Sequence, residues 1–121
     1  MACVALTGAA VAAPTVRLAV VDGAITPATT WYLDLAIESA EAAGDALLLV
    51  ELDTPGGLVN STESIVKSFL AAEVPVVVYV TPSGAHAASA GFFILLSADV
   101  AVMAPGTRTG ASSVVFGQGP T

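Results

Sequence analysis

The residues of this sequence whose types and spacing suit covalent chemistry are Ser89 and the small residues around it. Ser89 lies in the segment 83–91, among alanines and glycines, after an extended run and at the expected start of a helix. Small neighbours let another backbone approach the hydroxyl closely, and a helix N-terminus offers free N–H groups and the positive end of the helix dipole. Ser89 is therefore the candidate nucleophile. The alternative is a serine that only caps the helix or packs tightly.

The spacing around Ser89 supports the first interpretation. Ala87-x-Ser89-x-Gly91 is related to the strained strand-to-helix turn that exposes the nucleophile of serine hydrolases, with an alanine at the place of the first glycine. Such a turn needs a strand before the serine and a helix after it. The sequence therefore predicts that Ser89 lies near the start of a helix.

Acyl transfer at a serine also needs N–H donors for the oxyanion that develops on the attacked carbonyl. Gly56 and Gly57 follow an aliphatic run, and a glycine lets the backbone come near a substrate. The backbone N–H groups of Gly56 or Gly57, together with that of Ala90, are the candidate oxyanion hole. A simple turn after Pro55 would explain the same glycines, and a turn is also what exposes N–H groups.

The general base is not identified by these residues. His86 lies only three residues before Ser89, so it would have to fold back sharply to reach the hydroxyl. Lys67 falls on the polar side of a predicted helix, where a solvated charge is the simpler interpretation. Arg108 stays protonated and cannot act as a base.

Composition limits the class of protein. The chain has 121 residues, of which 55% are hydrophobic and 11% charged, with a formal net charge of −7. This length allows at most one domain, and the low charge content indicates burial or an assembly of several copies. No basic stripe is present, so nucleic acid is not an expected partner. With one cysteine, Cys3, and one histidine, no disulfide, no metal site and no cofactor is expected.

Hydrophobic periodicity predicts an α/β fold in which strands alternate with helices. Strands are expected over 16–21, 46–52, 75–80 and 100–103, and helices after Pro27, from about Asn60 and over 87–96. The strands are aliphatic throughout, which is typical of a parallel sheet covered on both faces. In such a sheet the loops after the strands lie at one edge, so loops 54–58 and 81–89 should lie side by side.

Helix ends are also predicted. Thr29 or Thr30 is expected to cap the first helix, and Gly44 to end it. Asn60 and Glu63 form a possible capping box for the second helix. The expected buried positions of the two helices are Leu33, Ile37, Ala40, Ile65, Val66, Phe69 and Leu70.

The two ends of the sequence give the expected domain boundaries. Residues 1–13 are apolar and small, with a pattern like a cleavage site but no positive start, so they are interpreted as a signal-peptide remnant or else an apolar arm. Residues 14–121 form a partial domain, because a strand start at Val114 has no helix after it. No run approaches the roughly 18 apolar residues that would span a bilayer.

Three motifs in this order resemble one family. They are LDTPGG at 52–57, GAHAASAG at 84–91 and MAPGT at 103–107. Together they are similar to the membrane-bound serine proteases of the NfeD type, relatives of Clp protease and signal peptide peptidase within the ClpP/crotonase fold. The resemblance runs from about Val16 to the end. It implies Ser89 as nucleophile and the Gly56–Gly57 loop with the Ala90 N–H as oxyanion hole.

The resemblance also implies a base, partners and a location. Clp protease uses a downstream histidine, and the stretch 109–114 contains none. The NfeD-type and signal-peptide-peptidase relatives use a lysine a few dozen residues beyond the serine, a position past Thr121, and a buried lysine with a lowered pKa can deprotonate a serine. The implied protein is an exported, membrane-associated homo-oligomer that cleaves apolar polypeptide segments, with stomatin-like membrane proteins as partners. By itself the fragment would be inactive.

Two other functions fit some of the same features. A crotonase-like acyl-CoA enzyme uses the same paired-loop oxyanion hole on a thioester, but it has no use for a serine at position 89. A non-catalytic scaffold that assembles membrane proteins would need no base at all. Binding of coenzyme A would indicate the first, and partner binding that is unaffected by Ser89→Ala would indicate the second.

Overall fold

The computed structural model describes residues 13–111. In chain order its elements are β1 (Val16–Asp22), α1 (Pro27–Ala43), β2 (Leu47–Asp53), α2 (Val59–Ala71), β3 (Val76–Val80), β4 (His86–Ala88), α3 (Ala90–Leu96), β5 (Val100–Met103) and β6 (Arg108–Gly110). The four expected strands and the first two expected helices are therefore confirmed to within a few residues. Residues 1–12 and the strand start at Val114 lie outside the described part.

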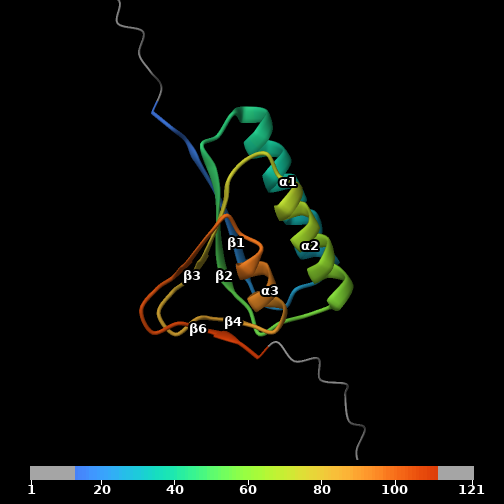
Figure 1. Cartoon of the computed structure of the whole chain (residues 1–121), viewed down its shortest axis with the longest axis vertical. Coiled ribbons are helices and arrows are strands. Elements are labelled where there is room, and N and C mark those ends of the chain that lie inside the picture. The colour runs from blue at the N-terminus through green and yellow to red at the C-terminus, as the bar shows by residue number, and fades with distance from the viewer. Residues whose placement is uncertain (1–12, 112–121) are drawn as a thin grey trace, which may run out of the picture.

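The strands form two parallel sheets. The larger sheet has the order β1-β2-β3-β5, and the smaller one pairs β4 with β6 (Figure 1). Each neighbouring pair of strands in the larger sheet is separated in the chain by a helix, as parallel pairing requires. The predicted α/β class with a parallel sheet is confirmed. All four carboxyl ends of the larger sheet point toward β4 and β6 (Figure 1).

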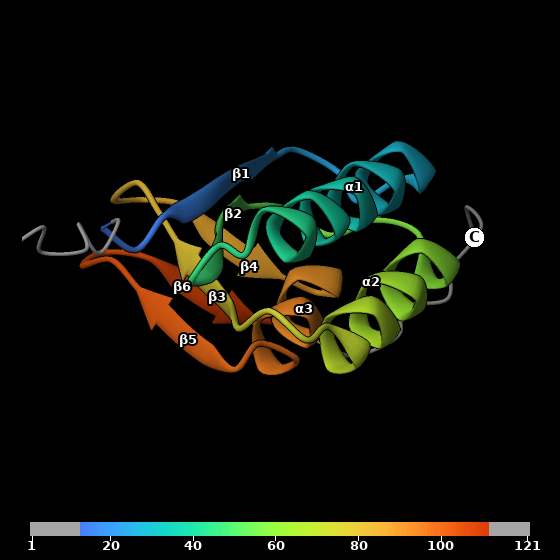
Figure 2. The same cartoon turned by 90° about the horizontal axis from the view of Figure 1, so that it is seen from above.

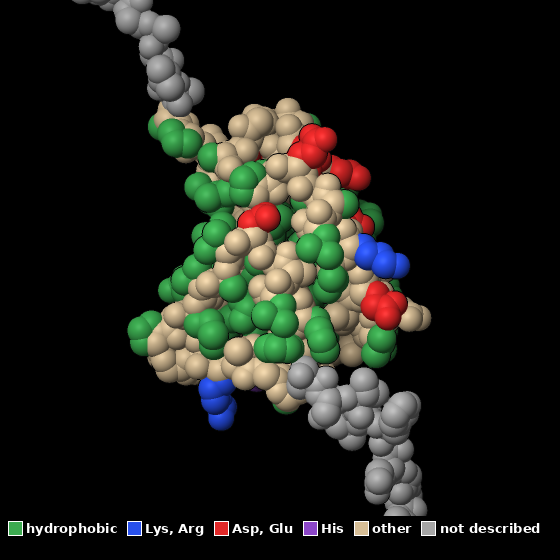
Figure 3. Space-filling view, in the orientation of Figure 1, with side chains coloured by type: hydrophobic (Ala, Val, Ile, Leu, Met, Phe, Trp, Pro, Cys, Tyr) green, Lys and Arg blue, Asp and Glu red, His purple; other side chains and the backbone are tan. Residues whose placement is uncertain are grey.

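The helices cover only one face of the larger sheet in the described chain. Figures 1 and 2 show α1, α2 and α3 on the same side, and the core lies between them and alternate strand residues such as Leu48, Val50 and Val78. On the other face Leu18 is 55% exposed and Val102 is 40% exposed, and hydrophobic side chains line that side in Figure 3. The expectation of two covered faces is wrong for residues 13–111, because aliphatic strand composition does not say which face a helix covers.

The start of α1 and the start of α2 both differ from the prediction. Thr26, not Thr29 or Thr30, is the N-cap of α1, because Pro27 occupies the first helical position; the Thr26 N–H donates to Thr29 Oγ1 at 3.1 Å. Leu58 precedes α2 and makes no side-chain cap. Asn60 therefore lies inside the first turn, and the capping box with Glu63 does not form.

The buried sides of the two long helices follow the apolar spacing with two exceptions. Leu33, Ile37 and Ala40 are buried on α1, as predicted. On α2, Ile65 and Phe69 are buried, but Val66 is only half-buried and Leu70 is 71% exposed. Leu70 lies one residue beyond Phe69, about 100° around the helix, so both cannot point into the core.

The expected helix over 87–96 begins later than predicted. Ala87 and Ala88 belong to β4, which pairs with β6, and α3 begins only at Ala90. Alanine has a high helix propensity, and here hydrogen bonding to two neighbouring segments outweighs it. β6 itself was not predicted, because Arg108-Thr109-Gly110 is too short to show a strand pattern.

Gly44 ends α1 in the left-handed region, with φ 68°, as the sequence predicts. Nothing lies within 4 Å of the position where a Cβ would stand. Gly44→Ala is therefore expected to lower the free energy of unfolding by about 1 kcal/mol, through backbone strain alone. Urea unfolding of the two proteins measures this difference, and an unchanged midpoint would contradict it.

Candidate active site

Ser89 has the backbone conformation of a strained turn. It lies between β4 and α3 with φ 54° and ψ −111°, a region that non-glycine residues rarely adopt. Its N–H donates to the Gly110 carbonyl oxygen of β6 at 2.8 Å, which fixes the turn to the smaller sheet. Backbone strain of this kind is kept at functional sites when the surrounding structure enforces it. The strand–serine–helix order expected from the spacing is present.

The loop after β2 touches Ser89 directly. A Cβ added to Gly56 would lie 3.0 Å from Ser89 Cβ and 3.4 Å from Ser89 Oγ. Gly56 also has φ 125°, which an L-residue rarely adopts. The predicted proximity of loops 54–58 and 81–89 is confirmed, and only a residue without a side chain leaves room for the serine.

Of the three predicted N–H donors, one is already hydrogen-bonded and two have no acceptor within residues 13–111. The Gly56 N–H donates to Thr54 Oγ1 at 3.2 Å, so it is already occupied. The Gly57 N–H and the Ala90 N–H have no acceptor among residues 13–111, and Ala90 is the first residue of α3, where the helix supplies none. Gly57 is exposed as well. The arrangement thus offers two free donors, one on each loop beside Ser89.

Thr54, which is not among the site residues predicted from the sequence, holds this arrangement together. Its N–H donates to the His86 carbonyl oxygen at 2.7 Å, and its own carbonyl oxygen accepts the Ala88 N–H at 3.1 Å. Its hydroxyl is within 3.2 Å of both the N–H and the carbonyl oxygen of Gly56. Thr54 is completely buried. The sequence does carry a signal for this role, because Thr54 stands directly after a buried strand and before Pro55-Gly56.

Removing the Thr54 hydroxyl should loosen the loop. Thr54→Val keeps the shape of the side chain but leaves the Gly56 N–H without a partner, and we expect it to lower the free energy of unfolding by about 1–3 kcal/mol. Thr54→Ser keeps the hydroxyl and serves as the matched control, with a smaller loss from the missing methyl group. Denaturant unfolding of both variants distinguishes the two effects. Equal losses would contradict the role of the hydroxyl.

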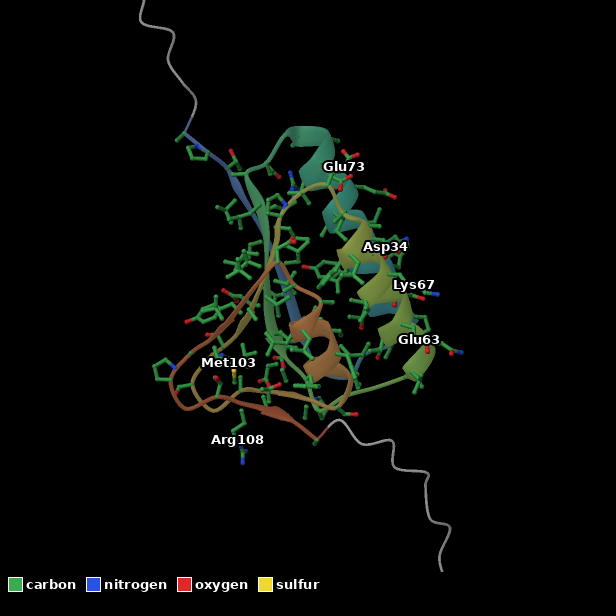
Figure 4. The ribbon with its side chains drawn as sticks, in the orientation of Figure 1. Asp34, Glu63, Lys67, Glu73, Met103 and Arg108 are labelled. Atoms are coloured by element: carbon green, nitrogen blue, oxygen red, sulfur yellow. The ribbon has the colours of Figure 1, made fainter. Side chains whose placement is uncertain are left out.

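The ionisable residues considered as bases do not bond to Ser89. His86 Nδ1 lies 3.6 Å from Asp53 Oδ1, and the same carboxylate oxygen accepts the His86 backbone N–H at 3.1 Å. Lys67 lies on the outer side of α2, and Arg108 points away from the fold at the end where β4 and β6 lie (Figure 4). Within residues 13–111, Ser89 Oγ has no hydrogen-bond partner.

Two further properties follow from the described residues. Between residues 13 and 111, no group of His, Cys, Asp and Glu side chains is arranged to hold a metal ion. No helix in that range is both long and apolar enough to cross a bilayer.

Sequence comparison identifies relatives of this chain. A family model described as the N-terminal domain of NfeD1b matches residues 15–121. The chain is 40% identical over 102 residues to the membrane-bound protease PH1510 of Pyrococcus horikoshii and 38% identical over 88 residues to the membrane protein NfeD1b of Bacillus subtilis. The first match covers 84% of this chain and 23% of the relative, the second 73% and 20%. The chain therefore spans about a quarter or less of these proteins.

Comparison with solved structures finds relatives of the same kind. One is a variant of the membrane-bound, stomatin-specific protease 1510-N, with a TM-score of 0.87 and 38% identity, covering 90% of this chain and 53% of that one. Another variant of 1510-N, bound to a substrate peptide, has a TM-score of 0.85 and 39% identity, and the match covers 89% of this chain and 49% of that one. ClpP1 from Listeria monocytogenes has a TM-score of 0.71 and 22% identity, and the match covers 78% of this chain and 55% of that one. At this identity the likeness supports the fold alone. The chain has the ClpP-like fold and belongs to the family of NfeD1b N-terminal domains.

Proposed function

We propose that this chain carries the nucleophile and the oxyanion hole of a serine endopeptidase of the membrane-associated NfeD/ClpP class. One observation supports this most. Ser89 stands in a strained strand-to-helix turn, in contact with Gly56, and the neighbouring N–H groups of Gly57 and Ala90 have no acceptor among residues 13–111. A serine kept as a helix cap would accept a hydrogen bond from the first turn of α3, and Ser89 makes no such side-chain bond.

The proposed reaction is acyl transfer to Ser89. The hydroxyl oxygen attacks the carbonyl carbon of a peptide bond while a base takes its proton, and the Gly57 and Ala90 N–H groups stabilise the negative charge on the carbonyl oxygen. The amine leaves with the proton from the base, and water then hydrolyses the acyl-serine. Gly56 contributes space for the serine and orients the loop through Thr54, since its own N–H is occupied.

We assign the base to a lysine that follows residue 121 in the complete natural chain, which makes a Ser-Lys dyad. The family resemblance implies this lysine. Its assignment is further supported by the 1510-N structures, one of which carries a serine-to-alanine and another a lysine-to-alanine substitution. His86 is a poorer candidate, because it makes no hydrogen bond to Ser89 Oγ within residues 13–111, although its Nδ1 lies 3.6 Å from Asp53 Oδ1.

Substrate, partner and location are proposed by analogy with the relatives. The 1510-N protease is described as specific for a stomatin homologue, and both curated relatives are named as membrane proteins. We propose that the complete chain cleaves apolar polypeptide segments, that a stomatin-like membrane protein is its partner, and that the domain lies on the extracytoplasmic side as a homo-oligomer. No cofactor is needed for this chemistry.

The test is cleavage of defined peptides by the purified complete chain. An apolar peptide and a version with its apolar residues replaced by serine are incubated with the protein, and the products are identified by mass spectrometry. We expect cleavage of the apolar peptide only. Absence of cleavage, with binding of coenzyme A, would instead indicate a crotonase-like enzyme. Absence of both, with intact binding of a membrane partner, would indicate a scaffold.

A further inference from the structure

We propose that the pocket on the outer face of β4 and β6 binds a carboxylate of the polypeptide substrate, with Arg108 as the main contact. This inference rests on the proposed function for the nature of the ligand, because a peptide bound at Ser89 passes next to the pocket. It goes further by giving the site a preference for acidic groups close to the cleaved bond.

The pocket is formed by paired strands. It has a volume of about 250 Å³ and is lined by His86, Ala88, Arg108, Thr109, Gly110 and Ala111. In the parallel pairing His86 stands opposite Arg108, and Ala88 stands opposite Gly110. Side chains of directly opposite residues point to the same face of a sheet, so the imidazole and the guanidinium share the outer face.

Arg108, the charged residue among those that line the pocket, has the sign opposite to the net charge of the molecule. The sequence has ten acidic residues and three basic ones, Arg17, Lys67 and Arg108. Arg17 is paired with Asp45 at 2.6 Å, whereas Arg108 has no carboxylate within 4.0 Å among residues 13–111. Asp53, which lies next to the pocket residue His86, accepts the His86 backbone N–H at 3.1 Å, and its Oδ1 lies 3.6 Å from the imidazole Nδ1. Arg108 therefore keeps its donors available for a planar carboxylate, which a guanidinium binds in bidentate fashion.

The pocket adjoins the nucleophile. Ala88 directly precedes Ser89, and the Gly110 carbonyl oxygen accepts the Ser89 N–H at 2.8 Å. Next to Gly110, Ala111 has φ 54°, a second non-glycine residue in the left-handed region. Two residues with positive φ, Ser89 and Ala111, thus directly follow the two paired strands that line the pocket. A substrate positioned for attack at Ser89 places its nearby side chains within reach of this face.

A carboxylate can come from an aspartate or glutamate side chain or from the C-terminus of a peptide. The experiment separates the two. Fluorescent apolar peptides carry either Glu or Gln at one position, scanned on both sides of the cleaved bond, and each is made with a free and with an amidated C-terminus. Dissociation constants are measured by anisotropy with the Ser89→Ala form of the complete chain, so that binding is read without cleavage.

We expect the Glu peptide to bind about two- to fivefold more tightly than its Gln partner at one or two positions, in the amidated series. Arg108→Gln should bring this ratio close to one. Lys67→Gln removes the same charge from the exposed side of α2 and should leave the ratio unchanged. The ratio should also fall at about 1 M salt, where the screening length is about 3 Å.

Each outcome decides a separate point. If only the free C-terminus improves binding, and Arg108→Gln removes that gain, the pocket binds a terminal carboxylate. If no peptide shows a preference, or if the preference survives Arg108→Gln, the inference is wrong. Because binding is measured apart from cleavage, a chain that prefers acidic peptides but cleaves none would overturn the proposed protease function and leave the pocket assignment standing.

Discussion

Replacing Ser89 by alanine in the complete natural chain is expected to lower the rate of peptide cleavage by at least about 10³-fold. Loss of the attacking oxygen leaves only the binding of the substrate and the stabilisation of the oxyanion, neither of which forms an acyl intermediate. The measurement is the initial rate of cleavage of an apolar peptide by the two proteins. Ser64→Ala, on the exposed side of α2, is the matched control and should retain full activity.

The same substitution should leave the fold intact. Ser89 Oγ has no hydrogen-bond partner among residues 13–111, and alanine keeps the Cβ that packs against Gly56. The strain at φ 54° is equal in both proteins, so urea unfolding should give the same midpoint within error. Ser89→Gly relieves that strain and should raise the free energy of unfolding by about 1 kcal/mol while also removing cleavage.

This pair of variants separates function from structure. If Ser89 served only as a helix cap, replacing it by alanine would lower the free energy of unfolding of the protein, and cleavage would persist. Retained cleavage in Ser89→Ala would remove Ser89 from the mechanism. A serine whose removal costs activity but no stability, and whose replacement by glycine stabilises the protein, is held in a strained turn for its chemistry.

Much of the larger sheet could be predicted from the sequence because its signals are local. Valine- and leucine-rich runs separated by helical patterns indicate a parallel sheet, and that topology places the loops after the strands at one edge. The contact between Gly56 and Ser89 follows from this rule together with the presence of glycine. Gly44 was also predictable, because a left-handed helix end favours glycine.

The features that were missed depend on long-range pairing. β4 is a short strand that bonds to Thr54 on one side and pairs with β6 on the other, and Gly110 of β6 also accepts the Ser89 N–H. The role of Thr54 likewise lies in bonds to His86 and Ala88, more than thirty residues away in the chain. Propensity and periodicity carry no information about such partners. The occupied N–H of Gly56 is a different case, because its acceptor Thr54 Oγ1 is only two residues away and a threonine hydroxyl commonly bonds the backbone locally in turns.

Gly57→Ala is expected to cause the largest loss of stability, at least about 3 kcal/mol. A Cβ at this position would lie 2.2 Å from the carbonyl oxygen of Ile25 and 2.5 Å from its backbone nitrogen. Ile25 is completely buried; its N–H donates to the Gly56 carbonyl oxygen at 2.9 Å, and its carbonyl oxygen accepts the Leu58 N–H at 3.0 Å. The backbone cannot move aside without breaking these bonds.

Gly23→Ala is the control that separates steric overlap from backbone strain. Gly23 has φ 122° but nothing within 4 Å of a Cβ, so its replacement should cost only about 1–2 kcal/mol. Urea unfolding of both variants compares the two costs. Equal losses would mean that the loop after β2 can shift away from Ile25. A much larger loss at Gly57 would mean that close contact between two backbones fixes the loop that carries Gly56 and Gly57.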